Sequence, residues 1–232
     1  MLPTLEVVVF DLDDTLYPEE EYVYSGFKAV GAWLQEKVGV PLDETAEELK
    51  RLYDSGHKHD TFDYWLSLNR LESTAHFSGM LRAYRDHTPS IHCFPSAESM
   101  LLRCRARFRL GLLSDGHLET QRRKIESLGI QRLFDVILLS DELGRESWKP
   151  SEIPYREVLK RLNADPRKTV YIGDNPLKDF VSARKLGMKT VRVVHPHGIY
   201  SNVEPPDPGH AADIDVTSLE DVESLLLNSQ RC

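Results

Sequence analysis

Short apolar runs separated by helical patterns constrain the fold of this chain more than any other feature of its sequence. Continuous aliphatic runs of four or so residues are typical of strands that are buried on both faces of a sheet. Such runs occupy residues 7–10, 110–113, 136–139, 170–172 and 191–194. Helical patterns follow at residues 118–128, 155–162 and 177–186, and a last strand and helix are expected at 212–216 and 219–227. This alternation predicts an α/β fold with a parallel, Rossmann-like sheet.

One stretch, residues 18–92, interrupts the alternation because it contains helical patterns and no convincing strand. Helices are expected at residues 22–38, 44–54, 62–71 and 72–84. In the first of these, Val23, Phe27, Val30 and Leu34 recur at helical spacing, which gives the helix one apolar face. We therefore expect an α/β core, residues 1–17 and 93–232, and an all-helical domain, residues 18–92, inserted after the first strand.

Charge and cysteine content narrow the possible partners. The chain has 29 Lys and Arg against 37 Asp and Glu, a net charge of −8, which argues against nucleic-acid binding. The apolar run at residues 7–10 is too short for a membrane span or a signal-peptide core. Cys93, Cys104 and Cys232 have neither disulfide-scaffold nor zinc-site spacing, so a cytoplasmic protein is expected. The sequence does not indicate an oligomeric state.

Polar residues cluster where the predicted strands end, which is where parallel sheets bind ligands. Asp11, Asp13, Asp14 and Thr15 follow the first strand. Carboxylates crowded at such a point repel one another unless a cation or polarised donors offset their charge. The alternative is an acidic loop in which Asp14 or Thr15 caps the next helix.

Three later segments place further chemistry at this edge. Ser114 and Asp115 open a turn whose hydroxyl and backbone amides can hold phosphate oxygens, although a plain turn is also possible. Lys149 follows the third strand and a loop, where a surface lysine is the simpler interpretation. Asp174 and Asp179 follow a fourth strand and suit a hard cation. The alternative is an Asp that caps the helix expected from Leu177 onward.

In this order, the four segments resemble the motifs of the haloacid dehalogenase superfamily of phosphotransferases. The pattern is D-x-D-x-T, then Ser or Thr after a strand, then Lys, then G-D-x-x-x-x-D. The helical insert resembles the type 1 cap of that family by its position and helical pattern. The matching residues are Asp11, Asp13, Thr15, Ser114, Lys149, Gly173, Asp174 and Asp179.

The resemblance implies a mechanism and a role for each matching residue. Asp11 would attack phosphorus to form an aspartyl-phosphate, and Asp13 would act as general acid and then general base. Mg²⁺ would be bound by Asp11, the Asp13 carbonyl and Asp174, and Asp179 would position Lys149 or a water on the metal. Phosphoryl oxygens would be held by Thr15, Ser114, the Asp115 amide and Lys149.

These implications favour a Mg²⁺-dependent phosphatase of a small phosphorylated metabolite, such as a sugar phosphate or a nucleoside monophosphate. A sugar phosphomutase shares every core motif, and a catalytically inactive phosphate-binding or interaction protein is the alternative from another class. A dehalogenase is disfavoured because Asp13 is present. A receiver domain is about half this length and has no helical insert.

Specificity is expected to reside in the cap, because the core motifs bind only the phosphoryl group. The loop at residues 55–60 joins two predicted helices, and Gly56 permits a sharp turn. Lys58 and His57 are the candidate substrate contacts, and a solvated loop that faces away is the alternative.

Overall fold

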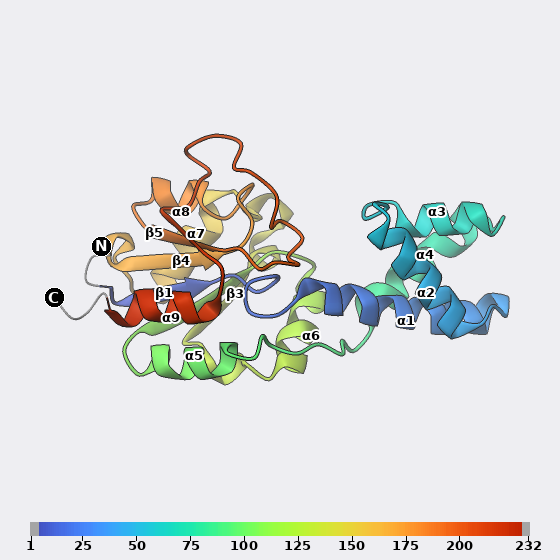
Figure 1. The fold of residues 1–232 in the computed structure, drawn as a ribbon, viewed down its shortest axis with the longest axis horizontal. Coiled ribbons are helices and arrows are strands. Elements are labelled where there is room, and N and C mark those ends of the chain that lie inside the picture. Colours follow the sequence, from blue (N-terminus) through green and yellow to red (C-terminus); the bar gives the residue numbers. More distant parts are fainter. Residues whose placement is uncertain (1–4, 229–232) are drawn as a thin grey trace. The chain divides into compact units, whose positions relative to one another are not determined.

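The computed structural model describes residues 5–228 and contains one six-stranded sheet. All neighbouring strands are parallel, and their order is β3-β2-β1-β4-β5-β6 (Figure 1). The predicted parallel α/β class is confirmed. The strands are β1 (Val7–Phe10), β2 (Arg109–Ser114), β3 (Val136–Leu139), β4 (Thr169–Gly173), β5 (Lys189–Val193) and β6 (Ile214–Val216).

Helices cover both faces of the sheet, as buried parallel strands require. On one face α7 and α8 pack together, and on the other α5 packs with α9 (Figure 1). The helices of this part are α5 (Ala97–Arg105), α6 (Leu118–Leu128), α7 (Glu152–Arg161), α8 (Val181–Lys185) and α9 (Leu219–Asn228). Four short 3₁₀ helices join them: η1 (Gln131–Leu133), η2 (Ser140–Leu143), η3 (Arg145–Ser147) and η4 (Pro166–Lys168).

Four helices follow β1: α1 (Glu19–Val38), α2 (Leu42–Asp54), α3 (Thr61–Leu68) and α4 (Ser73–Asp86). They form their own apolar core, in which Phe27, Leu34, Leu49, Trp65 and Met80 are buried. The chain divides into two compact units, residues 1–19 with 92–232 and residues 20–91. We call them the α/β unit and the helical unit.

Two helices of the α/β unit differ from the sequence prediction. The helix predicted at residues 177–186 begins only at Val181, because residues 174–180 form a turn that side chains hold together. The helix α5 was not predicted, although its buried residues recur at helical spacing. They are Ala97, Met100, Leu101 and Cys104.

The strand order positions the site. From β1 the chain continues outward to β2 and β3, and it then returns to the other side of β1 as β4, β5 and β6. The carboxyl ends of β1, β2 and β4 therefore lie side by side at the point where the strand order reverses, which is where open α/β sheets bind ligands.

Two further predictions concern membranes and cysteines. Within residues 5–228, none of the helices combines the length and the apolar character that a bilayer span requires. Cys93 and Cys104 form no disulfide in this part of the chain, and Cys232 lies outside the described residues.

Candidate active site

The loop after β1 begins with a buried carboxylate and turns sharply. Asp11 extends the sheet by one hydrogen bond, since its N–H donates to the Ile172 carbonyl at 2.8 Å. Asp14 has a φ of 48°, and its carboxylate accepts the Glu19 N–H at 2.8 Å and the Ile199 N–H at 2.7 Å. Asp14 therefore caps the start of α1, as the alternative interpretation of this loop allowed, and Asp11 and Asp13 remain for chemistry.

Lys149 is a buried cation and not a surface lysine. Its ammonium lies 2.9 Å from Asp11 Oδ1 and 2.8 Å from Asp179 Oδ1, and it donates to the Tyr171 hydroxyl at 3.0 Å. Burial alone would lower the pKa of Lys149, but Asp11 and Asp179 raise it well above its usual value. The side chain therefore stays charged where the first and fourth motifs meet.

Three buried carboxylates face one another beside this lysine. Oxygens of Asp11, Asp174 and Asp179 all lie within 4.8 Å of one another. Burial raises the pKa of Asp11 to about 7, although Lys149 opposes the shift. Burial, Asp179 and Asp11 together raise the pKa of Asp174 well above its usual value. Lys149 alone cannot neutralise three carboxylates, and the nearby Lys178 pairs with a fourth, that of Asp115, so the cluster favours a bound cation.

The fourth motif folds around Asp179. Its carboxylate accepts the Asn175 N–H at 2.9 Å, and Asn175 Oδ1 accepts the Leu177 N–H at 2.9 Å. A Cβ on Gly173 would lie 2.6 Å from Asp179 Oδ2, so a larger residue there would displace this carboxylate. The turn therefore holds the Asp179 carboxylate in contact with the Lys149 ammonium and the Asn175 N–H. Among the described residues, no hydrogen bond or ion pair is recorded for the Asp174 carboxylate, which fits a metal ligand.

Ser114 and Asp115 follow β2 beside these groups, and both are buried. The Asp115 carboxylate accepts the Ser140 hydroxyl at 2.6 Å and the Lys149 N–H at 3.2 Å, and Lys178 Nζ lies 3.3 Å from it. Asp115 thus joins the second, third and fourth motifs through its side chain. Binding of a phosphate oxygen by the Asp115 backbone amide remains a prediction.

Asp13 is held by residues that the sequence analysis did not identify. Its Oδ1 lies 2.6 Å from Lys124 Nζ and accepts the Tyr17 hydroxyl, and its Oδ2 accepts Gln121 Nε2 at 2.8 Å. Burial raises the pKa of Asp13, but Lys124, Tyr17 and Gln121 outweigh burial and lower it below its usual value. The same Gln121 amide donates to Ser114 Oγ at 2.6 Å.

The α/β unit thus brings Asp11, Lys149, Asp174 and Asp179 together. Thr15 lies in the same loop as Asp11, and its hydroxyl is buried with no hydrogen-bond partner among residues 5–228. Its contact with phosphate remains a prediction.

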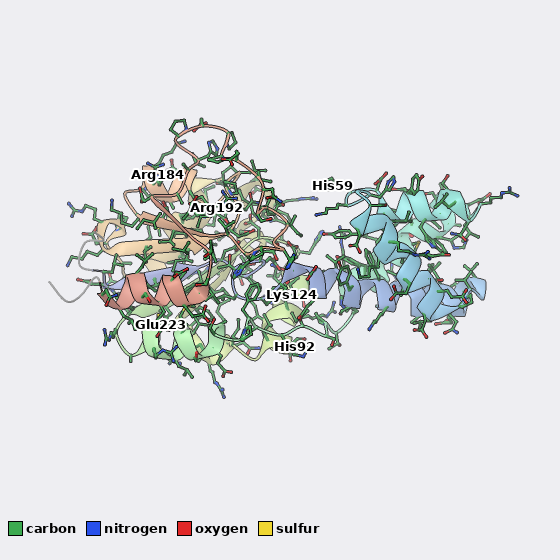
Figure 2. All side chains as sticks on the ribbon, viewed as in Figure 1. His59, His92, Lys124, Arg184, Arg192 and Glu223 are labelled. Carbon is green, nitrogen blue, oxygen red and sulfur yellow. The ribbon has the colours of Figure 1, made fainter. Side chains whose placement is uncertain are left out.

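Lys58 and His57 lie in the helical unit, in the loop before α3 (Figure 2 labels the next residue, His59). His57 packs on the Tyr64 ring at 3.8 Å between centroids and lies 3.1 Å from Asp60. Lys58 Nζ lies 5.4 Å from the centre of the Tyr53 ring.

A pocket of about 180 Å³ opens beside this loop. Its walls are partly aromatic, and its titratable lining residues other than tyrosine are Lys58, His59, Asp60 and Asp63. His59 lines it and His57 does not. Contact of Lys58 and His57 with a substrate remains a prediction. The aromatic lining residues are Phe27, Tyr53, Phe62, Phe77 and Tyr84.

Sequence reasoning missed Gln121, Lys124, Ser140, Tyr171 and Lys178. Their signal is weak, because each looks like an ordinary helix, turn or strand residue. A usable clue is the spacing of Gln121 and Lys124, which places both on one face of α6, the helix that follows the Ser114 turn.

Comparisons with known proteins agree with this geometry. A family model described as haloacid dehalogenase-like hydrolase matches residues 8–193. The glyceraldehyde 3-phosphate phosphatase of Methanopyrus kandleri is 30% identical over 225 residues, covering 91% of this chain and 93% of that protein. The phosphoserine phosphatase of Thermus thermophilus is 32% identical over 130 residues, 56% of this chain and 49% of that protein. A haloacid dehalogenase-type phosphatase structure from Thermococcus onnurineus superposes with a TM-score of 0.63 at 22% identity, covering 98% of this chain and 100% of that one.

Proposed function

The chain belongs to the haloacid dehalogenase-like hydrolase family, and from this premise we propose that it is a Mg²⁺-dependent phosphatase of a small phosphorylated metabolite. It is a hydrolase that acts on phosphate monoesters. One observation carries the finer proposal: the Lys149 ammonium lies 2.9 Å from the carboxylate of Asp11 and 2.8 Å from that of Asp179. A carboxylate beside a buried cation is placed to attack a phosphoryl group whose charge that cation offsets.

In the first step the Asp11 carboxylate attacks phosphorus. A bond forms between an Asp11 oxygen and phosphorus, and the bond from phosphorus to the leaving oxygen breaks. Asp13 gives its proton to that oxygen, which leaves as an alcohol. Lys149 offsets the negative charge that Asp11 and the phosphoryl group share during the transfer.

In the second step water cleaves the aspartyl-phosphate. Asp13, now ionised, takes a proton from the attacking water, and inorganic phosphate leaves with Asp11 restored. Ser114, whose hydroxyl already accepts a hydrogen bond from Gln121, and the Asp115 amide are the proposed donors to the phosphoryl oxygens. Asp13 thus ends the cycle protonated. The negative charge of a bound phosphate opposes the donors that lower the pKa of Asp13 in the free site, and so favours keeping this proton on Asp13 for the next turnover.

A divalent cation fits the carboxylate cluster, and Asp11, Asp174 and the Asp13 carbonyl are the residues that would hold it. The Asp179 carboxylate already binds Lys149 and the Asn175 N–H, so we propose that it positions Lys149 and does not bind the cation directly. Three oxygen ligands, two of them anionic, suit a hard divalent cation such as Mg²⁺. When bound, the ion would supply positive charge to the phosphoryl oxygens during transfer.

The leaving group is proposed to be small, and its identity to be set by the helical unit. The relatives above are named for a triose phosphate and for phosphoserine, so sugar and other short-chain phosphates come before nucleoside monophosphates among the candidates. Lys58 and the aromatic pocket of the helical unit are the proposed specificity element. Location in the cytoplasm stays a prediction from cysteine content.

Phosphate release from a panel of metabolites tests the proposal. The panel contains glyceraldehyde 3-phosphate, phosphoserine, hexose phosphates and nucleoside monophosphates, each with Mg²⁺ and with excess chelator. We expect phosphate release that depends on Mg²⁺ and is abolished in Asp11→Asn. After brief incubation of the wild type with substrate, mass spectrometry should detect phosphate bound covalently to the protein. Release that continues in Asp11→Asn, or in excess chelator, would exclude this mechanism.

A further inference from the structure

The residues that hold Asp13 come from α6 and lie outside every motif that identifies the site. Lys124 is labelled in Figure 2, and its side chain is only 5% exposed, whereas that of Arg122, two positions earlier, is 54% exposed. A lysine on a surface helix normally extends into solvent. Here its ammonium turns inward and ends 2.6 Å from Asp13 Oδ1.

Gln121 uses the same face of the helix. It is one helical turn before Lys124, so both side chains reach the loop after β1. Its amide nitrogen donates to Asp13 Oδ2 at 2.8 Å and to Ser114 Oγ at 2.6 Å. One side chain therefore connects the proposed acid with a proposed phosphate ligand, and each oxygen of the Asp13 carboxylate has a donor from α6.

The turn before α6 makes this contact possible. Gly116 has a φ of 134°, which favours glycine, and a Cβ there would lie 3.0 Å from the Gln121 side chain. Tyr17 closes the arrangement from the other side, because its hydroxyl donates to Asp13 Oδ1 and its ring lies 5.9 Å from Lys124 Nζ. The carboxylate is thus held in one orientation by three donors.

We propose that Lys124 and Gln121 are positioning residues for the proton transfers of Asp13. The inference rests on the proposed function, in which Asp13 protonates the leaving oxygen and later deprotonates water. Gln121 keeps the carboxylate aligned with the Ser114 side of the phosphoryl group. Lys124 holds the other oxygen of the same carboxylate, so loss of either donor misaligns Asp13 with the leaving oxygen. The misalignment should cost most for a leaving oxygen that depends on proton transfer.

A pair of aryl phosphates separates this role from simple packing. Phenyl phosphate and p-nitrophenyl phosphate have nearly the same shape, but the phenol oxygen needs a proton far more than the nitrophenol oxygen does. In Lys124→Met, which keeps the side-chain length, kcat on phenyl phosphate should fall about 100-fold, and kcat on p-nitrophenyl phosphate about 5-fold or less, within the range of general acid catalysis. KM should change little on either substrate. Asp13→Asn sets the largest loss that Lys124→Met can reach.

Two further variants control the measurement. Arg122→Met, on the same helix, should behave as wild type on both substrates, because Arg122 is exposed and pairs with Glu119. If Lys124→Met does not fold by circular dichroism, Gln121→Leu replaces it, since that change leaves the ammonium in place and should show the same dependence on the leaving group, to a smaller extent.

Equal losses on the two aryl phosphates, or losses confined to KM, would overturn the positioning role and leave a structural ion pair. Failure of the proposed function looks different, because wild type would then hydrolyse neither aryl phosphate, or Asp11→Asn would still hydrolyse both.

Discussion

The α/β unit and the helical unit use charge in opposite ways. At the carboxyl edge of the sheet, charged side chains are buried and engaged by several partners at once, as Lys149 is by Asp11, Asp179 and Tyr171. In the helical unit the charges lie at the surface around an aromatic pocket, and the Lys50–Asp54 pair is 37% and 42% exposed. The first arrangement fits one fixed reaction, and the second fits the role in substrate choice that we propose for the helical unit.

Energetics follow from this difference. Removal of one partner from a buried ion pair costs about 3–5 kcal/mol, because the remaining charge is left in a low dielectric. An exposed pair contributes about 0–1 kcal/mol. Changes in the α/β unit should therefore alter chemistry and stability strongly, and changes in the helical unit should alter mainly the choice of substrate.

The largest effect is expected for Asp11→Asn. The amide oxygen is a poor nucleophile, so kcat on every phosphate monoester should fall by at least about 10,000-fold. The variant should keep the circular dichroism spectrum of the wild type. A loss that varied among substrates would break the comparison, because it would place part of the substrate choice at the nucleophile.

Lys149→Met tests the difference in stability. This change leaves Asp11, Asp174 and Asp179 without their ammonium and should lower the free energy of unfolding by about 3–5 kcal/mol in chelator. The matched change in the helical unit, Lys50→Met, removes an exposed pair and should cost about 1 kcal/mol or less. Urea unfolding measures both. Similar values for the two variants would show that the buried cluster is not held by charge.

Much of this cluster is predictable from sequence, because its members follow apolar runs that form strands. The run at residues 7–10 became β1, and the acids after it and after β4 meet since parallel strands align their carboxyl ends. The roles assigned to these acids stay predictions. The partners of Asp13 could not be predicted, because Lys124 lies 111 positions away and its sequence context, next to Arg122 and Arg123, is that of a surface lysine. Only the approach of α6 to the loop after β1 turns it inward.

The turn at residues 174–180 shows the same limit at short range. Apolar spacing predicted that a helix starts at Leu177, but the start was wrong. The Asn175 and Asp179 side chains bond to backbone N–H groups and hold a turn there. Side-chain bonds to the backbone compete with helix formation, and hydrophobic periodicity does not register them.

Loss of a metal ligand should have the next largest effect on activity. Asp174→Asn should raise the Mg²⁺ concentration needed for half-maximal activity by about 10- to 100-fold, because an anionic ligand becomes neutral. In chelator the same variant should unfold at a higher temperature than wild type, since it removes one of three mutually repelling buried carboxylates. Mg²⁺ should reverse that order. Equal melting temperatures with and without Mg²⁺ in the wild type would mean that the cluster binds no cation.

The smallest effect is expected for Lys58→Ala in the helical unit. Lys58 lies beside the aromatic pocket, outside the reacting groups, so its loss removes binding to the leaving group and leaves transfer of the phosphoryl group intact. KM for the best metabolite of the panel should rise about 5- to 10-fold with kcat nearly unchanged, whereas both constants for p-nitrophenyl phosphate should stay within about 2-fold of wild type. His57→Ala is the matched control, because His57 does not line the pocket. If Lys58→Ala lowered kcat equally on both substrates, the division between fixed chemistry and variable recognition would fail at this residue, and Lys58 would belong with the charges of the α/β unit.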